Sequence, residues 1–114
     1  MSFWRKEVIQ PALDDETRRH IAEQREWIAR EPLNAKPYYH LAQLYRMDGR
    51  QEEALGLLLE AVRLDSGFAD AHAALAEVYV VREDYAAAWR HALAAEKGGN
   101  PKPAEMLRRY GIGP

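Results

Sequence analysis

The stretch YYHLAQLY at residues 38–45, followed by ALGLLLEA at residues 54–61, decides the fold of this chain. The same pattern of large, small and aromatic residues returns as HAALAEVY at residues 72–79 and AWRHALAA at residues 88–95. Every matched pair of positions is 34 residues apart. Self-similarity at a fixed period of this length is typical of a helical repeat array. We therefore expect at least two copies of one helix–turn–helix unit.

The pattern resembles the tetratricopeptide repeat, a helix–turn–helix unit of the same length, and the resemblance covers residues 35–102 well. It implies an all-α fold, a right-handed superhelix of antiparallel helix pairs with about six helices plus a short C-terminal capping helix. It also implies a module that binds other proteins. One departure is Glu83-Asp84, which stands where the family has a glycine turn.

Apolar stripes at helical spacing set the helix boundaries within the two clear copies. Alanines such as Ala42 and Ala54 are expected where the two helix backbones of a repeat approach closely, because larger side chains would clash there. We expect helices at residues 35–47, 51–64, 69–82, 85–97 and 103–110. The single domain at 1–114 then divides into repeats at 35–68 and 69–102 and a capping helix with a frayed tail at 103–114.

Residues 1–34 form either a degenerate repeat or an unrelated N-terminal cap. We expect a short helix over residues 2–10 that Pro11 breaks. A longer helix should follow from Asp14 or Asp15 to Arg30, since acidic residues favour a helix N-terminus. Two clean copies are fewer than the roughly three that repeat arrays need, so this segment should cover their exposed end.

Four apolar residues lie near the N-terminus: Phe3, Trp4, Val8 and Ile9. Two roles are possible for them. They either fold back on the neighbouring helix or form an arm that contacts a second subunit or another protein. The second possibility makes a homo-oligomer possible. It is the basis of an alternative function, a self-associating structural subunit that uses this arm or an open repeat end.

Composition excludes several classes of function. The chain has 114 residues, a net charge of −2 and charges of both signs along its length, so no basic surface for nucleic acid is expected. No apolar run reaches the ~18 residues of a membrane span, and no signal peptide pattern opens the chain. We expect a cytoplasmic protein. Without cysteine, disulfides and thiolate chemistry are impossible.

Catalytic and metal-binding motifs are not found in the sequence. It has no glycine-rich phosphate loop, no HExxH zinc motif and no nucleophile elbow. The four histidines, His20, His40, His72 and His91, fall in four different expected helices, and no two are four residues apart. We therefore predict no enzyme activity, no cofactor and no metal site, and a half-buried packing role for His72.

The resemblance implies that the first helix of each repeat lines a concave groove, which takes an extended or helical segment of a partner. The segment should be amphipathic and carry both charge signs, since the groove is basic toward the first clear repeat and acidic toward the second. Arg5 and Ile9 could extend this surface. The predicted function is that of a non-enzymatic adaptor or scaffold, and the expected groove residues are Lys36, Tyr39, Gln43, Arg46, Met47, Asp70, Ala73, Glu77, Val80 and Val81.

Overall fold

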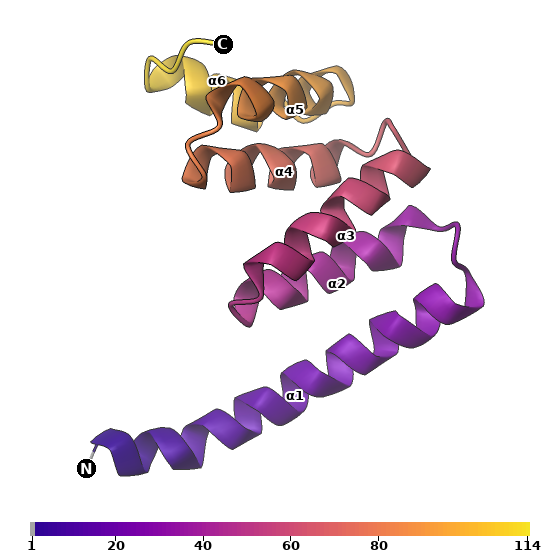
Figure 1. Ribbon diagram of the computed structural model, residues 1–114, viewed down its shortest axis with the longest axis vertical. Coiled ribbons are helices and arrows are strands. Elements are labelled where there is room, and N and C mark those ends of the chain that lie inside the picture. Colours follow the sequence, from indigo (N-terminus) through magenta and orange to yellow (C-terminus); the bar gives the residue numbers. More distant parts are fainter. Residues whose placement is uncertain (1) are drawn as a thin grey trace.

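The computed structural model describes the backbone of residues 2–114 and the side chains of residues 14–114. Helices follow one another through the molecule, from α1 at one end to α6 at the other (Figure 1). The expected all-α architecture is confirmed. The helices are α1 (Ser2–Arg30), α2 (Ala35–Met47), α3 (Gln51–Leu64), α4 (Ala69–Val81), α5 (Tyr85–Lys97) and α6 (Lys102–Arg109).

The predicted break at Pro11 is wrong, because α1 is one helix from Ser2 to Arg30. Figure 1 shows it as a continuous ribbon. A proline removes one backbone hydrogen bond and crowds the carbonyl four residues earlier, which bends a helix without necessarily ending it. The expected pair of N-terminal helices is therefore a single 29-residue helix.

Small side chains occupy the places where paired helices meet. Ala42 on α2 and Ala54 on α3 have no exposed surface, and Ala88 on α5 likewise has none. Leu58 and Leu75 fill the spaces between helices and are also fully buried. Tight packing of this kind leaves little room for larger side chains at the alanine positions.

The turns after α2 and α4 share one backbone conformation but not one residue type. Gly49 has φ +78°, and Glu83, one repeat later, has φ +61°. A side chain in this left-handed region meets the following carbonyl, at a cost of roughly 1–2 kcal/mol. The Asp84 carboxylate accepts a hydrogen bond from the Ala87 backbone N–H at 3.2 Å and caps α5. The turn therefore keeps its geometry despite an unfavourable residue.

Residues after α6 are anchored, so the expected frayed tail is wrong for Ile112. The Trp89 indole N–H donates to the Ile112 carbonyl oxygen at 2.9 Å, and the Ile112 backbone N–H donates to the Leu107 carbonyl oxygen at 3.0 Å. The Ile112 side chain also packs against the cluster that contains Trp89 and Leu107. One buried indole thus fixes the chain beyond the capping helix.

Replacing Glu83 by glycine should stabilise the protein by about 0.5–1 kcal/mol, because glycine adopts positive φ without steric cost. Chemical denaturation followed by helical circular dichroism measures this change. The matched control is Gly49→Ala, which should destabilise by about 1 kcal/mol at the equivalent turn. A Glu83→Gly variant less stable than the parent would contradict the strain assigned to this turn.

Candidate partner-binding groove

The residues expected to line a groove lie on α2 and α4, the first helices of the two clear repeats. Their exposure differs widely along each helix. Met47 and Val81, at equivalent positions near the ends of α2 and α4, are 79% and 82% exposed. Lys36, Asp70 and Glu77 are exposed, whereas Tyr39, Gln43, Arg46, Ala73 and Val80 are half-buried.

The charges at the centre of this surface pair with one another across the repeats. The Arg46 guanidinium on α2 donates to the Glu77 carboxylate on α4 at 3.3 Å and to the Gln43 side-chain oxygen at 3.2 Å. Both partners are partly solvated, so this bridge contributes only about 0–1 kcal/mol to stability. Its main effect is to leave the middle of the groove close to neutral.

Tyr39 is part of the packing between the repeats as well as of the groove surface. Its ring centroid lies 5.1 Å from that of Phe68, and its side chain packs against two clusters of buried residues. Burial raises the pKa of the Tyr39 phenol, and the carboxylates of Asp70 and Glu77 add to this effect. The hydroxyl therefore keeps its proton at neutral pH and remains a hydrogen-bond donor.

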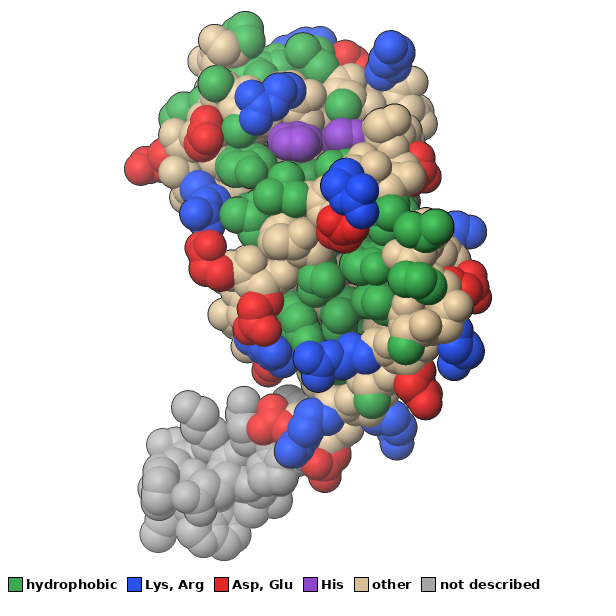
Figure 2. Space-filling view, turned by 45° about the vertical axis from the view of Figure 1, so that its right-hand side comes forward, with side chains coloured by type: hydrophobic (Ala, Val, Ile, Leu, Met, Phe, Trp, Pro, Cys, Tyr) green, Lys and Arg blue, Asp and Glu red, His purple; other side chains and the backbone are tan. Residues whose placement is uncertain are grey.

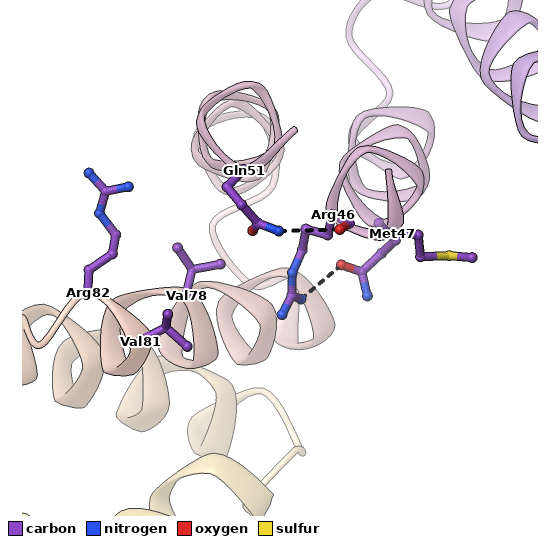
Figure 3. Close-up of a pocket in the computed structure, with 7 residues that line it drawn as sticks. Arg46, Met47, Gln51, Val78, Val81 and Arg82 are labelled. Carbon is purple, nitrogen blue, oxygen red and sulfur yellow. Dashed lines mark hydrogen bonds between the residues drawn. The ribbon is translucent and has the colours of Figure 1, made fainter. Parts of the chain in front are cut away.

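A hollow of about 600 Å³ opens between the ends of α2 and α4 and the start of α3. Val78 and Val81 form its apolar side, and Met47 and Gln51 stand at the other (Figure 3). Figure 3 shows Met47 pointing away from Val78 and Val81, on the rim of the hollow. The ends of the two helices thus present an apolar, accessible surface.

A second, smaller hollow of about 210 Å³ continues this surface onto α6. Val80 and Val81 of α4 line it together with Met106 and Leu107 of α6. Val80 also packs against the cluster of Trp89 and its neighbours, so it contacts another element and faces the hollow. Met106 was not expected at the site, although its exposed apolar position on the capping helix is visible in the sequence pattern.

The opposite end of the surface carries the charges of Lys36 and Asp70. Both line a shallow hollow at the N-termini of α2 and α4. Among residues 14–114, neither side chain is part of an ion pair. The surface is therefore charged at one end, internally paired in the middle and apolar at the other end.

Two histidines that are far apart in sequence lie in contact, which sequence reasoning did not predict. His72 Nδ1 on α4 is 3.0 Å from His91 Nδ1 on α5, and His72 Nε2 is 2.8 Å from the Ser66 carbonyl oxygen. Figure 2 shows adjacent histidine side chains among hydrophobic ones. His72 packs as expected but is more deeply buried than the expected half-buried position, since the residue is only 8% exposed.

With both rings neutral, the hydrogen bonds assign the protons of the pair. A carbonyl oxygen can only accept, so His72 Nε2 carries the proton and His72 Nδ1 accepts from the N–H of His91. His91 also stacks on Tyr79, with ring centroids 5.6 Å apart and planes inclined by 7°. The pKa of His91 is lowered to about 4. Burial is the largest cause, and the neighbouring His72 and Arg90 contribute the rest.

Acid should destabilise the protein through His91, whose unfolded-state pKa is about 6.5. Because the folded-state pKa is lower, the contribution to stability is complete above pH 6.5 and is lost as the pH falls toward 4. After discounting for the half-exposed ring, we expect a loss of about 1–2 kcal/mol across that window. Urea denaturation at a series of pH values measures it. His91→Gln should flatten the dependence, and an unchanged slope in that variant would contradict the assignment.

Several predictions concern parts of the chain whose side chains are not described. The side chains of five of these residues are not described, namely Phe3, Trp4, Arg5, Val8 and Ile9.

Within residues 14–114, no three His, Asp or Glu side chains gather where they could hold a metal ion. No helix of the described chain is long and apolar enough to span a bilayer.

A family model described as tetratricopeptide repeat matches residues 14–95. Because the match covers most of the chain, the protein belongs to the tetratricopeptide repeat family. Repeats of this family are protein–protein interaction modules, and this is the broad role of the chain. A comparison with curated proteins gives no match.

Proposed function

We propose that the chain is a cytoplasmic, non-enzymatic adaptor that holds a segment of another protein along α2 and α4. The observation that carries the proposal is the exposure of Met47 and Val81, which are 79% and 82% accessible beside the hollow at the helix ends. Methionine and other apolar side chains bury area readily at interface cores. Exposed apolar residues at equivalent places in two repeats are suited to one continuous ligand.

The distribution of charge restricts the ligand further. Arg46 and Glu77 already satisfy each other, so they offer little net charge to a partner. Lys36 and Asp70 offer one charge of each sign at the other end. A fitting segment is amphipathic, places apolar side chains over Met47 and Val81, and carries an acidic and a basic group near Lys36 and Asp70.

The experiment is affinity capture with the full chain, followed by identification of the proteins retained. The double variant Met47→Glu and Val81→Glu should lose the specific partner, because a charge at the centre of an apolar contact is costly to desolvate. Both residues are exposed, so the fold should be retained, and circular dichroism checks this. Tyr39 is unsuitable for this purpose because it packs against Phe68.

The matched control is Arg63→Glu, an exposed change on α3 that lines none of the three hollows of the proposed binding surface. It should leave capture unchanged. Equal capture by the parent and the double variant would contradict a binding site on α2 and α4, and the partner would then contact a different surface.

A further inference from the structure

A groove on a different face of α2 is left unfilled by residues 14–114, whose side chains the structure describes. It lies between α1 and α3, has a volume of about 570 Å³, and is floored by Leu41 of α2. Ile28 and Ala29 line the α1 wall, and Gly56 and Leu57 line the α3 wall. It uses none of the residues assigned to the concave surface of α2 and α4.

Gly56 is the unusual residue of this groove. It lies inside α3, where glycine is destabilising by roughly 0.5–1 kcal/mol relative to alanine. A Cβ atom built at Gly56 meets no atom within 4 Å, so no contact within the described part of the chain requires a glycine there. Together with Ala29 on the opposite wall, it leaves room for another backbone to approach closely from outside.

The α1 helix is much longer than the helix on which it packs. It has 29 residues, about 43 Å, whereas α2 has 13 residues, about 20 Å. The described contacts of α1 with the core come from its second half, through Ile21 and Ile28. Figure 1 shows the first half leading away from the other helices. The described part of the chain therefore carries both an open groove and a helical segment that extends beyond the helix on which α1 packs.

Charge favours a second copy of this chain as the occupant. Arg25 stands on the α1 wall of the groove and Glu53 on the α3 wall. In an antiparallel pair of α1 helices that overlap completely, Ser2 lies beside Arg30 of the second copy. The same register places Glu7 beside Arg25 and Trp4 beside Ile28 of the second copy. An acidic residue thus falls opposite a basic one, and an apolar residue falls opposite an apolar one.

We propose that two copies form a symmetric dimer in which the first half of each α1 occupies the groove between α1 and α3 of the other. The arrangement is isologous, since each copy supplies one helical segment and one groove, and it therefore closes at two chains. It goes beyond the proposed adaptor function because the concave surface of α2 and α4 stays open in the dimer.

Sedimentation equilibrium of the full chain tests the proposal. The mass should be twice that of the 13.1 kDa chain, and the fraction of monomer should rise as the protein is diluted. Gly56→Leu should weaken dimerisation at least about tenfold by filling the groove. Its fold should survive, because the added side chain points into open space and leucine favours helix. The matched control, Gln51→Leu, adds the same side chain to α3 at the other hollow and should leave the dimer unchanged.

Charge exchange tests the register independently of Gly56. Glu7→Arg and Arg25→Glu should each weaken the dimer by roughly three- to tenfold through like-charge contacts, and the double variant should restore it. A parent chain that stays monomeric at every concentration would overturn the proposal. So would a dimer that Gly56→Leu leaves intact, or a double variant no tighter than its single parents. None of these results bears on partner capture by Met47 and Val81, so the two proposals fail separately.

Discussion

The close approach of helix backbones through alanine is the constraint on which this structure depends. Ala42 and Ala54 lie at the crossing of α2 and α3 without any exposed surface, and Ala76 and Ala88 repeat the arrangement 34 residues later. The same tightness holds within the second clear repeat, where a Cβ on Gly98 would come 3.0 Å from that of Ala69. Because these contacts need only small side chains, they use one face of each helix and leave the others free.

The free faces are where the two repeats differ, and function is to be sought there. Repeated positions such as Leu41 and Leu75 are buried and serve the core. Unshared positions form a surface that is charged at Lys36 and Asp70 and apolar at Met47 and Val81. A module built in this way can exchange its ligand specificity without changing its fold, because the residues that pack and the residues that face a ligand are separate.

The repeat helices could be predicted from sequence because one stripe of residues determines each of them. The predicted bounds of α2, α3 and α5 agree with the structure, and that of α4 differs by one residue. Sequence could not decide whether the helix continues through Pro11, because a proline can either bend or end a helix. Contacts between distant side chains, such as His72 with His91 and Trp89 with the Ile112 carbonyl, depend on how helices are placed and leave no periodic signal.

Groove composition was foreseeable, but its internal pairing was not. The repeat pattern predicted ten groove residues on α2 and α4. The contacts of Arg46 with Glu77 and of Tyr39 with Phe68 are seen only in the structure. The first contact joins adjacent repeats and the second lies within residues 35–68, so both depend on how the helices are placed in space. The ion pair of Arg46 and Glu77 leaves unpaired charge at one end of the surface, on Lys36 and Asp70, while the other end at Met47 and Val81 is apolar.

Site-specific photo-crosslinking tests the central claim most directly, that a partner segment lies along α2 and α4. A photoreactive amino acid placed at position 47 or 81 of the full chain, and at position 63 as a control, is activated in the source cell. The account predicts that positions 47 and 81 crosslink to the same protein while position 63 does not. Crosslinking of that protein from position 63 alone would contradict it.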